Sequence, residues 1–102
     1  MQTEGDAVFE RAAELFSLLS APIRLRILSE ICKGEVNATE LLTRIDCTQP
    51  NLSQHLALMY RLGILFKRRE GNHIFYRIEN GPLTEICRSI CVDIAGGMGN
   101  TA

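Results

Sequence analysis

The segment Cys47-Thr48-Gln49-Pro50-Asn51-Leu52-Ser53-Gln54-His55-Leu56 combines a helical spacing of leucines with an otherwise polar composition. The two leucines lie four residues apart, and Met59 and Tyr60 extend the same stripe, so the pattern predicts a helix to about residue 62 with these side chains inward. Thr48 is suited to cap the start of this helix, and Gly63 to end it. The outer face then carries mainly polar groups, from Gln49, Ser53, Gln54, Ala57 and Arg61.

Hydrophobic periodicity predicts four further helices and one hairpin. The strand-like runs are Ile64–Arg68 and His73–Ile78, which flank the turn pair Gly71-Asn72. The helix before the quoted segment starts after Asn37, which forms a loose capping box with Glu40. The predicted fold is mainly α with a small β-hairpin, in the order α-α-α-α-β-β-α, as one domain over residues 1–102. The other helices cover about residues 5–19, 22–33 and 82–95.

Two short helices joined by a tight turn (38–62) and followed by a hairpin (64–78) are typical of a winged helix-turn-helix. The second helix of such a motif lies in the major groove of DNA, where Gln and Asn amides can both donate to and accept from base edges. The basic hairpin can reach the phosphate backbone or the minor groove. The candidate DNA-binding residues are Thr48, Gln49, Asn51, Ser53, Gln54, His55, Arg61, Lys67, Arg68, Arg69, Asn72 and His73.

The charge distribution agrees with a local phosphate-binding surface. The chain carries a net charge of −1, but residues 41–80 hold six Lys or Arg against three Asp or Glu. Residues 1–40 hold four against seven, and residues 81–102 hold one against two. The predicted helix-turn-helix and wing therefore form a basic patch on an acidic frame.

Several classes of protein are disfavoured. No apolar run approaches the roughly 20 residues that span a bilayer, and the first residues lack the pattern of a signal peptide, so we expect a cytoplasmic protein. The four cysteines, at positions 32, 47, 87 and 91, form no C-x-x-C pair, which disfavours a zinc ribbon or a thioredoxin-type enzyme. We expect no catalytic activity and no resident cofactor.

Over roughly residues 9–95 the chain resembles the ArsR/SmtB family of bacterial winged helix-turn-helix repressors. The resemblance implies a homodimer that binds an inverted-repeat operator in double-stranded DNA and dissociates when an inducer acts on it. It also implies that the first and last helices, about 5–19 and 82–95, form the dimer interface. The segments that carry the resemblance are LLSAPIRLRIL (18–28), TQPNLSQHLALMYRLGIL (48–65) and RREGNHIFYRI (68–78).

Two sensor sites of that family are missing from this chain. The arsenic and lead or cadmium sites need a C-x-C type motif near the third helix, where this sequence reads NATELLTRID (37–46). The zinc or nickel site needs histidine on the last helix, which has none. The only histidines, His55 and His73, lie in the predicted DNA-reading region.

Thiols remain as candidate sensors, at Cys32, Cys87 and Cys91. One branch of the family, the sulfide and persulfide sensors, joins a cysteine of the second helix to one of the last helix, and this sequence has cysteines on both of those helices. Ser29 stands at the usual second-helix position, and Cys32 follows one turn later on the side we expect to face the core. Three thiolates could alternatively bind As(III) or Cu(I) as inducer, or the cysteines could be small core residues. We interpret Cys47 as a turn residue.

Overall fold

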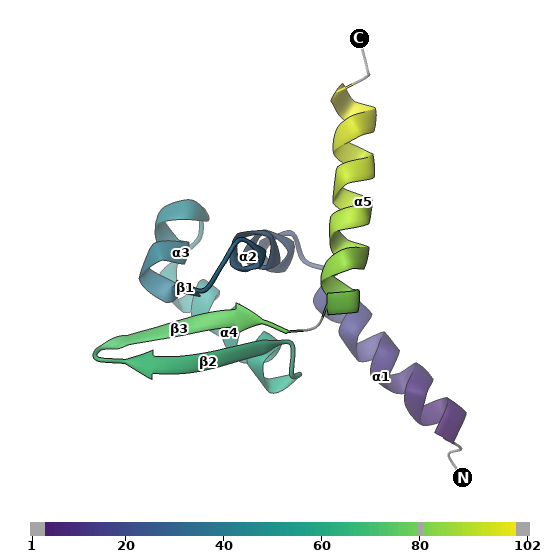
Figure 1. Cartoon of the computed structure of the whole chain (residues 1–102), viewed down its shortest axis with the longest axis horizontal. Coiled ribbons are helices and arrows are strands. Elements are labelled where there is room, and N and C mark those ends of the chain that lie inside the picture. Colours follow the sequence, from purple (N-terminus) through teal and green to yellow (C-terminus); the bar gives the residue numbers. More distant parts are fainter. Residues whose placement is uncertain (1–3, 80, 100–102) are drawn as a thin grey trace.

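The helix-turn-helix and its wing form one layer of the molecule, from which the first and last helices extend (Figure 1). The structure is a computed structural model that describes residues 4–79 and 81–99. The predicted domain boundaries at residues 1 and 102 therefore lie outside the described residues. The elements are α1 (Glu4–Leu18), α2 (Pro22–Cys32), β1 (Val36–Asn37), α3 (Ala38–Arg44), α4 (Gln49–Arg61), β2 (Leu65–Glu70), β3 (His73–Ile78) and α5 (Gly81–Gly99).

One apolar core joins these elements, and each helix except α5 supplies it with a fully buried side chain. The stripe predicted for α4 is confirmed for Leu52, Leu56 and Met59, which are at most 2% exposed. From α5 only the start of the helix takes part, through Leu83 and Cys87. The largest fully buried side chains are Leu18, Ile27, Leu28, Val36, Leu41, Leu52, Met59 and Ile64.

Both predicted helix caps of the helix-turn-helix are confirmed. The Thr48 side chain accepts a hydrogen bond from the Asn51 amide at 3.3 Å, and the Asn37 side chain accepts one from the Glu40 amide at 2.8 Å. Each cap satisfies one of the amides that the first turn of a helix leaves without an intrahelical partner. The caps fix where α3 and α4 begin, and so the angle of the turn between them.

The sheet has three antiparallel strands in the order β1-β3-β2. The hairpin turns at Gly71, whose φ of +61° favours glycine, and its register pairs Arg68 with Phe75 and Glu70 with His73. Strand β1 was not predicted, because two residues are too short to show alternation. Its pairs, Val36 with Tyr76 and Asn37 with Phe75, attach the wing to the body of the domain.

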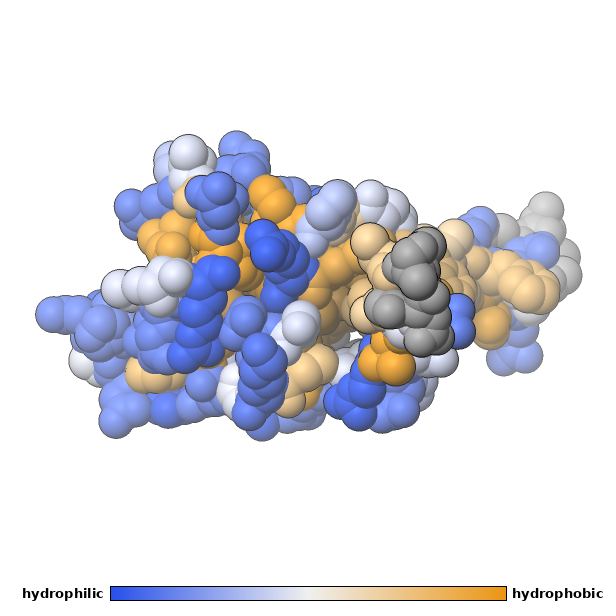
Figure 2. Space-filling view, turned by 90° about the horizontal axis from the view of Figure 1, so that it is seen from above, coloured by the Kyte–Doolittle hydropathy of each residue, from blue (hydrophilic) through white to orange (hydrophobic). Residues whose placement is uncertain are grey.

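Helices α1 and α5 leave much of their apolar surface uncovered. Phe9 is 75% exposed and Ile90 is 53% exposed, whereas Leu18 at the end of α1 is fully buried. Viewed along α5, hydrophobic side chains lie on the surface around α5 and α1 and also in the middle of the molecule, and the edge farthest from α1 is mostly hydrophilic (Figure 2). The predicted end of the last helix at about residue 95 is wrong, since α5 continues through Gly96 and Gly97. The remaining exposed apolar residues of the two helices are Val8, Phe16, Ile86, Val92, Ile94 and Met98.

Candidate nucleic-acid interface and thiol site

The outer face of α4 is polar and free of the core, as the sequence predicts. Thr48 and all five residues expected on that face, Gln49, Ser53, Gln54, Ala57 and Arg61, are exposed. The face carries amide and hydroxyl groups on successive turns of the helix. Pro50 is the second residue of α4, so the first turn has one amide fewer to satisfy. Such a face can form hydrogen bonds with the base edges of a major groove.

His55 lies beside this face rather than on it. Its Nδ1 atom is 3.3 Å from Nη1 of Arg24 in α2, and its side chain is half-buried. Burial and the positive charge of Arg24 lower the pKa of His55, so a neutral ring that accepts at Nδ1 fits the contact. The sequence predicts a DNA contact here, but the structure turns Nδ1 of the ring toward α2.

Tyr60 corrects the predicted inward stripe of α4. It is 45% exposed, and Nζ of Lys67 lies 4.1 Å from the centre of its ring. A cation over an aromatic face at this distance is a favourable contact of about 0.5–1 kcal/mol at an exposed site. Tyr60 thus attaches the basic strand β2 to the end of the helix that would read DNA.

The basic residues of the wing differ in what surrounds them. Arg68 forms ion pairs with Glu35, at 2.6 Å, and with Glu70, at 2.7 Å. Arg69 is exposed and donates from Nε to the Gly71 carbonyl at 3.2 Å. Asn72 and His73 are exposed at the tip, as predicted for groove contacts. Among the predicted wing contacts Lys67, Arg68 and Arg69, Arg68 is therefore the one for which the structure gives carboxylate partners.

A shallow depression of about 250 Å³ lies between α4 and the wing. Ser53 of the recognition face and Asn72 and His73 of the wing line it, together with Asn37 and Thr39 at the start of α3. The sequence does not predict that Thr39 lies in this depression, because the pairing of β1 with β3 brings the start of α3 against the wing. The depression joins the predicted helix contacts to the predicted wing contacts in one continuous polar surface.

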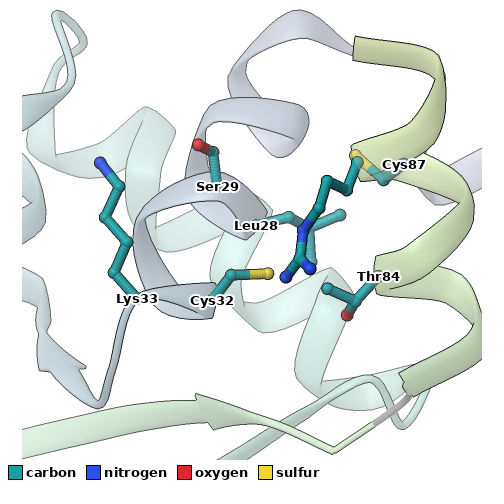
Figure 3. A pocket seen from close by; sticks show the side chains of 7 residues that line it. Leu28, Ser29, Cys32, Lys33, Thr84 and Cys87 are labelled. Atoms are coloured by element: carbon teal, nitrogen blue, oxygen red, sulfur yellow. The ribbon is translucent and has the colours of Figure 1, made fainter. Parts of the chain in front are cut away.

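The candidate sensor thiols lie at the other side of α2, where it packs against α5. A pocket of about 250 Å³ separates the two helices. Cys32 enters it from the end of α2, and Cys87 and Thr84 face it from α5 (Figure 3). Its lining residues are Leu28, Ser29, Cys32, Lys33, Thr84, Cys87 and Arg88.

The four cysteines are free thiols with different exposure. Cys87 is buried, and burial, Cys91 and Cys32 together raise its pKa. Cys32 was expected on the core side of its helix but is exposed, as is Cys91. Cys47 is half-buried in the turn before α4, which agrees with a turn residue that packs against the core. Cys32 and Cys87 are thus brought to one pocket, and Cys47 is not.

The three-thiolate arrangement considered for a soft metal is not assembled in the chain. Over residues 4–79 and 81–99, no group of three His, Cys, Asp or Glu side chains is placed to hold a metal ion. Within the same residues, no helix is long and apolar enough to cross a membrane.

A capped helix-turn-helix with a polar outer face, followed by a basic two-stranded wing, defines the class of winged helix-turn-helix DNA-binding proteins. Residues 21–67 match the model of the bacterial regulatory protein family arsR. The chain is 39% identical over 87 residues to the biofilm growth-associated repressor of Agrobacterium fabrum, a match that covers 82% of this chain and 74% of that protein. The chain belongs to the ArsR family of transcriptional regulators.

Solved structures agree with this assignment. The transcriptional repressor BigR from Xylella fastidiosa superposes with a TM-score of 0.76 at 31% identity, over 87% of this chain and 93% of that one. A homodimeric winged helix-turn-helix DNA-binding domain from Mycobacterium bovis superposes with a TM-score of 0.81 over 96% and 91% of the two chains. Its identity of 21% supports the fold alone. The predicted fold class is confirmed.

Proposed function

We propose that this ArsR-family regulator binds an inverted-repeat operator as a homodimer and is released when its cysteine thiols are oxidised or persulfidated. The observation that carries the proposal is the placement of three surfaces on one chain. A polar reading face on α4 lies at one end, exposed apolar faces on α1 and α5 lie at the other, and the thiol pocket lies between α2 and α5.

The DNA contacts divide between base edges and backbone. The amides on the exposed side of α4 suit adenine, which presents one donor and one acceptor in the major groove. The cations at the end of α4 and in the wing suit phosphates, and the tip residues suit a minor groove. We assign these contacts to Thr48, Gln49, Asn51, Ser53, Gln54, Arg61, Lys67, Arg69, Asn72 and His73.

The dimer interface is assigned to α1 and α5. Both helices expose bulky apolar side chains in the isolated chain, and a soluble monomer seldom leaves such a contiguous surface in water. Association of two copies through these helices would bury Phe9, Phe16, Ile90 and Ile94. A two-fold axis through this interface would place two α4 helices at symmetric half-sites, which an inverted repeat requires.

The release step is assigned to Cys32 and Cys87, with Cys91 one turn further along α5. Cys32 is exposed and meets an oxidant first, whereas burial raises the pKa of Cys87 and makes that thiol the less reactive of the two. A disulfide forms when the two thiols lose two protons and give two electrons to the oxidant. A persulfide donor instead transfers its outer sulfur to the Cys32 thiolate and leaves as a thiol. The Cys87 thiolate then attacks the inner sulfur of the Cys32 persulfide, which forms the Cys32–Cys87 disulfide and releases hydrogen sulfide.

The experiment measures the affinity of reduced protein for its own promoter region and for a duplex of scrambled sequence, by fluorescence anisotropy over a range of salt. We expect preference for the promoter and an affinity that falls steeply with salt as phosphate contacts release counterions. Persulfide donors, arsenite and copper(I) are then added in parallel. Equal affinity for both duplexes would refute operator binding, and release by arsenite or copper(I) alone would favour a soft-metal inducer.

A further inference from the structure

We propose that Arg68 is a positioning residue that holds the wing through Glu35, and that it is not itself a DNA contact. This inference rests on the proposed DNA-binding function and departs from the sequence prediction, which places Arg68 among the phosphate contacts. It concerns how the other wing residues are presented to DNA.

All three nitrogens of the Arg68 guanidinium donate to carboxylates of the chain. Its Nη2 donates to Oε1 of Glu35 at 2.6 Å, and its Nε lies 2.9 and 3.0 Å from the two oxygens of the same carboxylate. Its Nη1 donates to Oε2 of Glu70 at 2.7 Å, and the group lies 4.7 Å from the centre of the Phe75 ring. Forked contacts of this kind have more geometric specificity than a single-point ion pair.

The local charge also argues against a phosphate ligand. Two carboxylates surround one guanidinium, so the cluster of Glu35, Arg68 and Glu70 carries a net negative charge. The hydrogen bonds that Arg68 donates to Glu35 and Glu70 raise the pKa of Arg68, and the one to Glu35 lowers the pKa of that carboxyl group. A phosphate approaching Arg68 would meet two carboxylates that already accept from all three of its nitrogens.

The contact spans the whole sheet. Glu35 immediately precedes β1, Phe75 lies on the central strand β3, and Arg68 lies on the far strand β2. Phe75 pairs with Asn37 on one side and with Arg68 on the other, so the guanidinium crosses the ring to reach Glu35. The two backbone pairs of β1 are otherwise the only strand pairing, within the described residues, that joins the hairpin to the body. The contact therefore adds an attachment at β2, the strand farthest from β1, on the sheet face opposite the contact of Lys67 with Tyr60.

The direction of the side chains gives a further reason. Successive residues of a strand point to opposite faces of the sheet, so Lys67 and Arg69 share one face and Arg68 points from the other. The face of Lys67 is the one toward α4, because Lys67 lies over Tyr60. Arg68 is consequently on the sheet face turned away from the reading helix. Its proposed role is to fix the angle of the wing relative to the body of the domain, from the sheet face opposite α4.

The test is a mutant cycle on operator binding by the reduced full-length chain, with Glu35→Gln, Arg68→Gln, the double variant and Arg69→Gln as the matched control. We expect Glu35→Gln and Arg68→Gln each to weaken operator binding by about three- to fivefold, which is the scale of an exposed charge network. The double variant should show no further loss of affinity, because the two residues act as one unit. Neither Glu35→Gln nor Arg68→Gln should change the slope of log affinity against log salt. Arg69→Gln should make that slope shallower by the contribution of about one phosphate contact.

Two further variants separate positioning from contact. Arg68→Lys keeps the charge but not the fork, so a positioning residue loses affinity and a phosphate contact does not. The swapped pair Glu35→Arg with Arg68→Glu should restore binding toward the parent value. If Glu35→Gln binds as tightly as the parent or tighter, and Arg68→Gln lowers the salt slope by one, Arg68 contacts phosphate and the proposal is wrong.

Hydrogen exchange of the free protein separates this proposal from the function on which it rests. The β2 amides should exchange faster in Glu35→Gln and Arg68→Gln than in the parent and in Arg69→Gln. A parent that shows no operator preference would refute the proposed function. Unchanged exchange in both variants would refute the positioning role, whatever the DNA result.

Discussion

The Nη2 atom of Arg11 in α1 donates a 2.6 Å hydrogen bond to the carbonyl of Leu62, the residue that ends α4. A helix leaves its last carbonyls without intrahelical partners, and a cation there also interacts favourably with the helix dipole. Arg24 makes a second connection, since it donates to the Leu18 carbonyl at 2.8 Å and also contacts His55. The helix proposed for dimerisation is thus fastened to the proposed reading helix at two places.

Replacing Arg11 by Met should therefore affect both stability and DNA binding. We expect a loss of about 1 kcal/mol in the free energy of unfolding, the scale of one hydrogen bond to a charged group near the surface. Urea unfolding measures it, and Arg26→Met, the same change at an exposed arginine of α2, is the matched control. If both variants unfold at the same urea concentration, the Arg11 contact has no stabilising role.

The contact between Arg24 and His55 predicts a specific pH dependence. Burial and Arg24 lower the pKa of His55 in the folded chain below its usual value of about 6.5. The unfolded chain therefore takes up the proton first as the pH falls, and the folded state loses stability from about pH 6.5 down to the folded pKa. Above pH 6.5 both states hold a neutral ring, and His55 adds no pH dependence.

The measurement is unfolding by urea at pH 7.5 and at successive values down to pH 5. His55→Gln should lose less stability over this interval than the parent, whereas His73→Gln, at an exposed histidine of the wing tip, should follow the parent. Parallel curves for all three proteins would contradict the lowered pKa of His55.

The elements that the sequence predicts well are those determined within a few residues of chain. The α4 helix follows from its leucine spacing and from Thr48, whose cap bonds an amide three residues away. The polar reading face follows from the same spacing. The glycine turn of the hairpin is equally local, since Gly71 alone requires a positive φ there.

The features that the sequence does not predict depend on partners far away in the chain. Strand β1 forms only because β3, about forty residues later, supplies its pairs. The partner of Arg68 is 33 residues away, and that of His55 is 31 residues away. Tyr60 shows the inward spacing but lies at the edge of the stripe, where Lys67 and solvent meet it. Charge type and helical spacing alone therefore cannot distinguish a DNA contact from a structural ion pair.

The exposed apolar faces of α1 and α5 predict the effect of a charge at their centre. Ile90→Glu should convert the proposed homodimer into monomers, because a carboxylate would be buried without a partner in the proposed interface. Sedimentation velocity measures the mass, and Ser89→Glu, the same charge one residue earlier on α5, is the control. Operator affinity should fall with the loss of the dimer. A dimeric Ile90→Glu variant would place the interface elsewhere.

The thiol pocket predicts which cysteines matter. Cys32→Ser and Cys87→Ser should each abolish release of the operator by persulfide donors, while Cys47→Ser, outside the pocket, should respond like the parent. Mass spectrometry of the treated parent should find a peptide in which Cys32 and Cys87 are linked. If Cys32→Ser and Cys87→Ser both respond like the parent, these thiols are not the sensor.

The position of Glu35 connects the thiol pocket to the wing. Cys32 ends α2, the Lys33 and Gly34 amides close that helix end by bonding to Glu30 and Ile31 carbonyls, and Glu35 follows directly. A bridge at Cys32 that moves this helix end should therefore move the Glu35 carboxylate, and with it Arg68 and β2. The prediction is that Glu35→Gln lowers the ratio of reduced to oxidised operator affinity, because the wing no longer follows α2.

Anisotropy titrations of both redox states of the parent, Glu35→Gln and Glu30→Gln measure this ratio. Glu30 is a suitable control because it is an acidic residue of the same helix whose ion pairs go to Lys33 and Arg44 instead of the wing. We expect Glu30→Gln to keep the ratio of the parent. If Glu35→Gln keeps it as well, the movement reaches α4 by another route, and the fastening of α1 to α4 through Arg11 and Arg24 is the next contact to test.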